Sequence, residues 1–303
     1  MGCPDWPTCF GQWIPPTRID QLPADYKEKN AAYRDKKNQK FARYLSMIGL
    51  QQTADKMLTD PSILKEEDFN PTKTWVEYIN RLVGVAIGML IIAVFVTAWP
   101  IRQGSPTLFT GALALLALVI FQGWFGSIVV STNLTAWTIT VHMFLAVVMV
   151  WLLVWLWVRS GSGVAVAPSS LRPWLLVGIL AMLIQTFLGT QVRETLDRVA
   201  LIAARSQWIS QAGFDFIIHR SFSWVVVLSQ IAIYLKLRKT SSEKTLYLVP
   251  ILLVLCSVLT GTAMAYFNIP ATMQPIHLLV AVVSVGWMFQ IYLQSHNRTV
   301  TAI

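Results

Sequence analysis

The chain alternates long apolar stretches with short polar connections. Seven stretches are long enough for a membrane helix, because a bilayer core of about 30 Å needs roughly 20 apolar residues. They are Trp75–Trp99, Thr107–Val130, Thr135–Val158, Arg172–Val192, Gly213–Leu235, Thr245–Phe267 and Ala271–Leu293. Trp75, Trp99, Trp137 and Trp174 lie at or near the ends of these stretches, as in an aromatic belt at the headgroup level. The pattern predicts seven membrane-spanning helices.

Composition supports a membrane protein and excludes a soluble globular one. Of 303 residues, 55% are hydrophobic and 13% are charged, and the mean hydropathy is +0.55, outside the range of soluble domains. The net charge is +9, but the basic residues after residue 81 are spread between the apolar stretches and form no phosphate-binding patch. We therefore expect a lipid bilayer as a partner and no nucleic acid.

The basic residues of the short connections predict an orientation. Eight lie on one side of the membrane: Arg102, Arg159, Arg172, Lys236, Arg238, Lys239, Lys244 and Arg298. The connections on the opposite side carry Arg193, Arg198 and Arg205. Because positive charge accumulates on the cytoplasmic side, we expect a multi-pass protein of the cell membrane with its C-terminus in the cytoplasm and residues 1–74 outside.

An outer N-terminal segment raises the question of how it crosses the membrane. Met1 is followed by Gly2-Cys3-Pro4-Asp5, without the charged and apolar regions of a signal peptide. We expect that a membrane helix originally preceded residue 1. The alternative is translocation of the N-terminal segment by the first span.

Two outer regions are predicted to form further helices. Residues 22–60 are rich in Lys, Asp, Gln and Ala and suit polar helices over the membrane surface. In Glu194–Gln211, the residues Leu196, Val199, Ile202 and Ala203 form an apolar stripe. This stripe predicts an interfacial helix.

Cys3 and Cys9 flank a short loop that contains two prolines. Outside the cytoplasm such a pair can oxidise to a structural or redox-exchanging disulfide, which we favour. The alternatives are two unpaired thiols or part of a metal site, although no histidine occurs in the first 100 residues. Cys256 lies within an apolar stretch and is expected to be a buried, small apolar residue.

The two halves of the membrane region resemble each other. Glu77-Tyr-Ile-Asn80-Arg81 matches Phe216-Ile-Ile-His219-Arg220 at an offset of 139 residues, and the segment beginning at His142 matches the one beginning at His277 at an offset of 135. Each half thus pairs one repeat-related position, Asn80 or His219, with a histidine two spans later, His142 or His277. The second half has a span, Arg172–Val192, whose counterpart would precede residue 1, in agreement with a missing helix.

Three of the four histidines lie at membrane depth. A single one is most simply a helix-packing residue, but polar groups at repeat-related positions in lipid mark function. His219 and His277, on separate helices, can bind the two faces of a haem b iron. His296 lies in the tail beside Asn297 and Arg298, where we expect it to be solvated.

Charged residues beside these positions suggest further roles. Arg220 and Arg81 each follow a repeat-related position, where they could pair with a haem propionate, or else only anchor the helix at the interface. Glu77 lies one helical turn before Asn80, whereas the second half has Phe216 there. A carboxylate at that edge could move protons during oxidation, and the alternative is an interfacial glutamate without a role.

At these residues the chain resembles the haem A synthase family over essentially its whole length. The motifs are Cys3-Pro-Asp-Trp-Pro-x-Cys9, Glu77-Tyr-x-x-Arg81, Phe121-Gln-Gly-Trp-Phe-Gly-Ser127 with the His142 helix, Gln185-Thr-Phe-Leu-Gly-Thr-Gln-Val-Arg193, His219-Arg220, and the His277 helix. The family has eight helices in two pseudo-symmetric four-helix bundles. The resemblance thus implies an all-α membrane protein that begins after the first helix.

The resemblance also implies an activity. The family oxidises a methyl group of haem O to a formyl group, which gives haem A for terminal oxidases. By position, His219 and His277 would ligate the iron of a permanent haem b. Glu77 matches the catalytic acid, and Cys3 and Cys9 match the outer disulfide.

The first half would hold the substrate, haem O, with His142, Asn80 and Arg81. The family commonly has histidine where this chain has Asn80, and an amide is a poor iron ligand. His142 alone could then hold the substrate haem, with one axial position open or filled by water.

These expectations divide the chain into five parts. They are an extracytoplasmic segment 1–74 with the cysteine pair, an N-terminal half 75–159 on the substrate side, a cytoplasmic linker 160–171, a C-terminal bundle 172–294 on the haem b side, and a cytoplasmic tail 295–303. The expected partners are haem O, haem O synthase, an unidentified electron acceptor and a second copy of the chain.

Two other functions fit the same residues. The chain could be a haem carrier or oxidase-assembly factor without chemistry, or a b-type cytochrome that uses His219 and His277 for electron transfer. Glu77 distinguishes an enzyme from a pure carrier, because a carrier does not need this carboxylate.

Overall fold

The computed structural model is helical, and it describes residues 2–162, 167–240 and 244–295. Within these ranges seven helices are long and apolar enough to cross a membrane. They are α3 (Pro71–Ala98), α4 (Pro106–Ser131), α5 (Ala136–Trp157), α6 (Arg172–Val199), α8 (Gly213–Thr240), α9 (Lys244–Tyr266) and α10 (Met273–Gln294). The predictions of an all-α fold and of seven spans are confirmed, whereas the two four-helix bundles stay a prediction. His296 and Arg298 lie outside the described residues.

The polar segment before α3 also forms helices. It contains α1 (Tyr26–Met47) and α2 (Gln51–Thr59), with the short 3-10 helices η1 (Ile19–Gln21) and η2 (Pro61–Leu64) on either side. The prediction of helices within 22–60 is therefore confirmed. The short helices η3 (Val158–Ser162), η4 (Ser169–Leu171), η5 (Arg205–Gln207) and α7 (Trp208–Gln211) lie in later connections.

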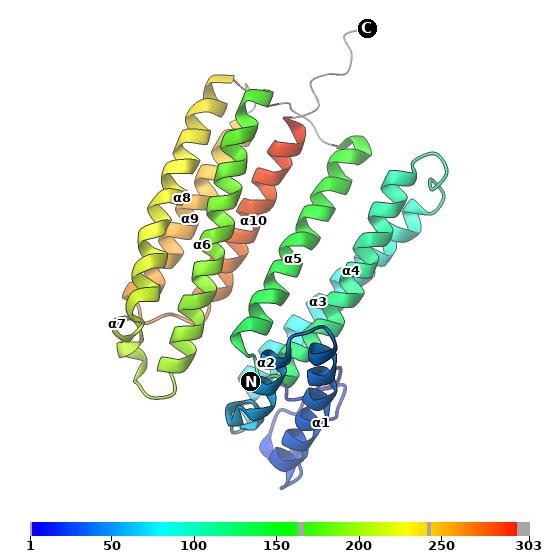
Figure 1. Ribbon diagram of the computed structural model, residues 1–303, viewed down its shortest axis with the longest axis vertical. Coiled ribbons are helices and arrows are strands. Elements are labelled where there is room, and N and C mark those ends of the chain that lie inside the picture. The colour runs from blue at the N-terminus through cyan, green and yellow to red at the C-terminus, as the bar shows by residue number, and fades with distance from the viewer. Residues whose placement is uncertain (1, 163–166, 241–243, 296–303) are drawn as a thin grey trace. The chain divides into compact units, whose positions relative to one another are not determined.

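The chain forms two compact units, residues 1–146 and 147–303, with the boundary inside α5. In the first unit, α1 packs against α2 and against one end of α4 (Figure 1). Their shared core contains Phe41, Leu45 and Met57 from the outer helices and Phe125 and Ile128 from α4. Asn38 donates a hydrogen bond of 2.9 Å to the carbonyl of Ser131. The outer helices are thus anchored on a membrane helix by both apolar and polar contacts.

In the second unit, α6, α8, α9 and α10 run side by side (Figure 1). Helix α6 packs against α8 and α10, and α9 packs against the same two helices. Leu175, Ile233, Leu237, Met288 and Ile291 are among the core residues. This arrangement places α8 next to α6 and α10 next to α9.

Helix α3 begins before the predicted start. The Asn70 side chain accepts a hydrogen bond from the amide of Lys73 at 3.0 Å, and Pro71 occupies the first helical position. Asparagine caps the free amides of a helix start, and proline there has no amide to lose. The extra turn positions Thr74 and Glu77 to face the outer loop.

Two expectations are wrong, one about an interfacial helix and one about the burial of a cysteine. The predicted interfacial helix in Glu194–Gln211 does not form, because α6 continues to Val199 and only η5 and α7 follow. Ion pairs from Arg193 to Asp197 and from Arg198 to Glu194 support this extension at i,i+4 spacing. Cys256 is exposed on α9 rather than buried, because it lies on a face of α9 that the other described helices leave open.

Candidate functional site

The loop from Cys3 to Cys9, called the outer loop here, is closed by a disulfide. Cys3 and Cys9 are joined, with their Cα atoms 4.9 Å apart, and both are buried. No group of three or more His, Cys, Asp or Glu side chains that could hold a metal ion occurs in the part of the chain that the structure describes. The structure therefore has the favoured disulfide and neither of its alternatives.

Asp5 organises the interior of this loop. Its carboxylate accepts hydrogen bonds from the amides of Phe10 at 2.6 Å and Gly11 at 3.0 Å, and from the hydroxyl of Thr8. The side chain is buried. Charge-assisted hydrogen bonds of this kind are stronger than those between neutral groups, so the loop has a defined shape in addition to its disulfide.

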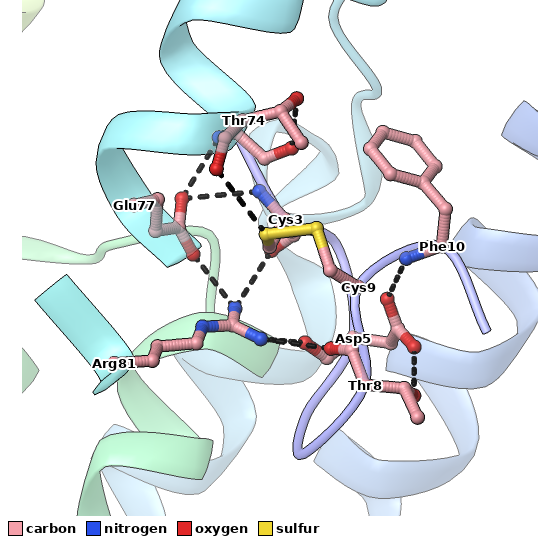
Figure 2. A network of polar contacts seen from close by, with 9 residues as sticks. Cys3, Asp5, Thr8, Cys9, Phe10, Thr74, Glu77 and Arg81 are labelled. Carbon is pink, nitrogen blue, oxygen red and sulfur yellow. Dashed lines mark hydrogen bonds and ion pairs between the residues drawn. A yellow bond between two sulfur atoms is a disulfide. The ribbon is translucent and has the colours of Figure 1, made fainter. Parts of the chain in front are cut away.

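Glu77 connects the loop to α3. One carboxylate oxygen accepts from the amides of Gly2 at 2.8 Å and Cys3 at 3.1 Å, and the other accepts from Arg81 at 2.7 Å. Figure 2 shows the carboxylate between the loop main chain and the guanidinium. Both oxygens thus have donors from this chain.

Arg81 binds the loop main chain in addition to Glu77. It donates to the carbonyls of Asp5 at 2.7 Å, Thr8 at 2.8 Å and Cys3 at 3.2 Å (Figure 2). Because these bonds occupy both terminal nitrogens, the predicted pairing with a propionate would need Arg81 to share or exchange them. That role stays a prediction.

The repeat-related position in the second half is different. Arg220 is exposed, and its guanidinium carbon lies 5.8 Å from the centre of the Phe216 ring. Both arginines thus contact the residue four positions earlier, Glu77 in one half and Phe216 in the other. Within the described residues, the contact of Arg220 is with this ring and not with a loop main chain.

Helix α1 covers the loop from the outside. The Tyr33 hydroxyl donates to the Trp6 carbonyl at 2.9 Å, and the Lys37 ammonium lies 5.8 Å from the centre of the Trp6 ring. Burial, and then the charge of Arg81, lower the pKa of Lys37 below its usual value. The loop, α1 and the first turns of α3 therefore form one electrostatically coupled region.

His219 on α8 and His277 on α10 face each other. Their ring centres are 6.4 Å apart, with planes at 69°. The Thr260 hydroxyl is 2.9 Å from Nδ1 of His277 and donates its hydrogen to the carbonyl of Cys256 or Ser257. A hydroxyl that donates to a carbonyl accepts from Nδ1–H, the tautomer in which Nε2 of His277 carries no hydrogen.

His142 on α5 lies against α4. Its ring stacks on Phe125 with centres 6.3 Å apart, and its carbonyl accepts from Gln122 at 2.9 Å. The buried Nδ1 has no hydrogen-bond partner among the described residues. Asn80 is exposed on α3, and no contact joins it to His142 in the described part of the chain.

The sequence reasoning missed the residues that hold these histidines. They are Gln122, Gln185 and Thr260, whose side chains reach a histidine from the preceding span. A signal was present, because each is a polar side chain inside an apolar stretch, where such residues mark function. Asp5 was quoted within a motif but received no role.

These features define a polytopic helical membrane protein with a disulfide-closed outer loop and repeat-related histidines at membrane depth. Comparison with known proteins gives the family. The family model of cytochrome oxidase assembly proteins, COX15-CtaA, matches residues 1–289, and the chain belongs to this family, that of the haem A synthases.

One curated relative is named heme A synthase and comes from Shewanella oneidensis. It is 23% identical over 193 residues, which cover 62% of this chain and 47% of that protein. The match thus spans about half the length of the relative. No solved structure matches the chain.

Proposed function

We propose that this protein is a haem A synthase that oxidises a methyl group of haem O to a formyl group. Family membership supports the proposal, and Glu77 is the observation that carries it. A carboxylate held at one repeat-related position and replaced by Phe216 at the other indicates chemistry in the first half alone. The reaction converts a methyl group and one water into a formyl group, four protons and four electrons, and the electrons pass to an external acceptor.

His219 and His277 fit a permanent haem b. Their ring centres lie 6.4 Å apart, a separation at which both imidazoles could bind one iron. The contact of Thr260 with Nδ1 would favour the tautomer that presents Nε2 of His277, as residues behind a ligand commonly do. When bound, haem b supplies reversible one-electron transfer, and the exposed Arg220 would pair with a propionate.

In the first half, His142 would bind the iron of the substrate haem O. Gln122 fixes the main chain of His142, and Phe125 restrains its ring. Asn80 offers an amide, which is a poor ligand for iron, so His142 would be the single protein ligand. Glu77 would take up protons at its carboxylate as the methyl group is oxidised, and Arg81 would keep that carboxylate in place.

The proposed location is the cell membrane, with residues 1–74 extracytoplasmic and the C-terminus cytoplasmic, as the distribution of basic residues favours. Haem O would arrive from haem O synthase through the bilayer. We also propose that the electrons pass to a separate, unidentified acceptor and that the protein forms homo-oligomers. A disulfide between Cys3 and Cys9 suits an oxidising compartment.

The test is the haem extracted from the purified full chain, produced in a host that makes haem O and separated by chromatography. Wild type should yield haems B and A. Glu77→Gln keeps the size and hydrogen-bonding oxygen of the side chain, so it should retain haem B and accumulate haem O. Glu194→Gln, which alters another i,i+4 pair with arginine, is the matched control and should behave as wild type.

Each alternative function predicts a different extract. Haem O bound by wild type without any haem A would indicate a carrier, and haem B alone would indicate a b-type cytochrome. Unchanged haem A in Glu77→Gln would remove the role proposed for Glu77.

A further inference from the structure

A glycine of the preceding span faces each of the three histidines at membrane depth. A Cβ atom added to Gly126 would lie 3.3 Å from Cε1 of His142, one added to Gly189 would lie 3.2 Å from Cε1 of His219, and one added to Gly261 would lie 3.3 Å from Cε1 of His277. These distances are shorter than ordinary van der Waals contact. A Cβ atom at any of these positions would therefore require the ring edge to move by a few tenths of an ångström.

This arrangement is not a general property of the glycines in the spans. Gly84, Gly88 and Gly123 have nothing within 4 Å of an added Cβ. Gly178 and Gly286 do approach other helices, but Gly178 faces Met288, Ile233 and Gln230, Gly286 faces Val150, and neither faces a histidine. The close approach to an imidazole thus occurs at the three histidines of the proposed haem sites.

A second contact accompanies the glycine at two of the three positions. Gln122, one turn before Gly126, donates to the carbonyl of His142 at 2.9 Å. Gln185, one turn before Gly189, donates to the carbonyl of His219 at 3.0 Å. Residues four apart lie on one helix face, so the glutamine fixes the histidine main chain while the glycine leaves room for its ring.

At the third position a different polar group contacts the histidine, and it contacts the ring and not the main chain. Thr260 precedes Gly261 and contacts Nδ1 of His277 at 2.9 Å. Gly126 and Gly261 each lie sixteen residues before their histidines and are related by the same offset of 135 residues as His142 and His277. The arrangement therefore repeats together with the histidines.

We propose that Gly126, Gly189 and Gly261 are positioning residues that set the rotation of the haem-binding imidazoles. A side chain at any of them would push the ring edge by a few tenths of an ångström or more and turn the imidazole about its Cβ–Cγ bond. Ligand orientation is a main control that a protein has over a bound metal. This inference rests on the proposed haem sites.

The experiment uses the full chain, purified in detergent with its bound haem. Gly261→Ala and Gly189→Ala should shift the EPR g values and the midpoint potential of haem b, and Gly261→Val should shift them further. Retention of haem b should fall about 10-fold or more, the usual effect of altering a residue that orients a metal ligand. None of these three measurements depends on catalytic turnover.

Two controls separate positioning from damage to the fold. Gly126→Ala alters the first half, so it should leave the EPR signal and potential of haem b unchanged while it weakens binding of added haem O. Gly123→Ala, on the same helix with open space around it, should change neither the EPR signal and potential of haem b nor the binding of haem O. Equal losses of haem b in Gly126→Ala and Gly261→Ala would mean general destabilisation and would overturn the proposal.

Failure of this inference differs from failure of the proposed function. If wild type holds haem b and the Gly189 and Gly261 variants keep its g values, potential and retention, only the positioning role is wrong. If wild type holds no haem b, the proposed haem site fails and the positioning role fails with it.

Discussion

Arg81 and Arg220 occupy related positions but have different environments. Arg81 makes four hydrogen bonds to the outer loop and Glu77, whereas Arg220 lies exposed over an aromatic ring. A hydrogen bond to a charged group contributes about 1.5–3 kcal/mol when it is partly buried. The stability of the loop should therefore depend on one arginine and not on the other.

Replacement of Arg81 should open the outer loop. In Arg81→Ala the carbonyls of Cys3, Asp5 and Thr8 lose their donor, so a reductant should reach the disulfide about 10-fold faster or more, which corresponds to about 1.4 kcal/mol. The measurement is the rate of thiol release from the intact protein. Arg220→Ala is the matched control and should react at the wild-type rate, and equal rates in both variants would contradict the role of Arg81.

The buried pair of Arg34 and Glu66 should give the outer segment a pH dependence. Their charged groups are 2.8 Å apart, yet burial raises the pKa of Glu66 above its usual 4.5. A carboxyl with a raised folded-state pKa binds more protons when folded, so its contribution to stability is lost as pH rises from about 4.5 through the raised value.

Glu66→Gln should remove this dependence because its side chain cannot ionise. The difference in unfolding temperature, variant minus wild type, should increase as pH rises over that window. Tryptophan fluorescence during heating measures it. A difference that is constant with pH, or that falls, would show that Glu66 does not titrate as described.

At the scale of elements, the first turns of α3 and the outer loop pack without space for a side chain at residue 2. A Cβ atom on Gly2 would lie 2.6 Å from the carbonyl carbon of Lys73, and main-chain atoms of a helix cannot move aside as a side chain can. The hydroxyl of Thr74 also donates to the Gly2 carbonyl at 2.8 Å.

Gly2→Ala should therefore separate the loop from α3. We expect faster proteolysis of residues 2–12 and the loss of the amide donors to Glu77. Gly84→Ala, within α3 and with open space around it, should show neither effect. Wild-type protection of the loop in Gly2→Ala would refute the tight packing at this position.

The spans could be predicted from sequence because each needs about 20 apolar residues, a pattern that few other structures share. The end of α6 could not, because the stripe of Leu196 and Val199 fits both an interfacial helix and the last turns of a long one. The contacts of Arg81 could not be predicted either, since their acceptors are main-chain carbonyls, which every residue has. The glycines that face the histidines could not be predicted, because their role depends on the distance between helices.

At the scale of the whole molecule, the proposed orientation can be tested with single cysteines. In a background without Cys3, Cys9 and Cys256, Leu201→Cys should react with a membrane-impermeant maleimide in intact cells. Gly104→Cys should react only after the membrane is opened, because it lies on the side with eight basic residues. Both positions are exposed, so the reverse pattern would invert the proposed topology.

The different use of the two arginines bears on how long each half keeps its ligand. An enzyme must release its product at every cycle, whereas a permanent redox group must stay for the life of the protein. In the first half, Arg81 is already satisfied by the loop, so an anionic ligand there gains less from it and can depart. In the second half, the Arg220 side chain makes no hydrogen bond to a loop among the described residues, where it lies over Phe216. If the proposed haem sites are correct, a single disulfide-closed loop would give the ligands of the two halves different residence times.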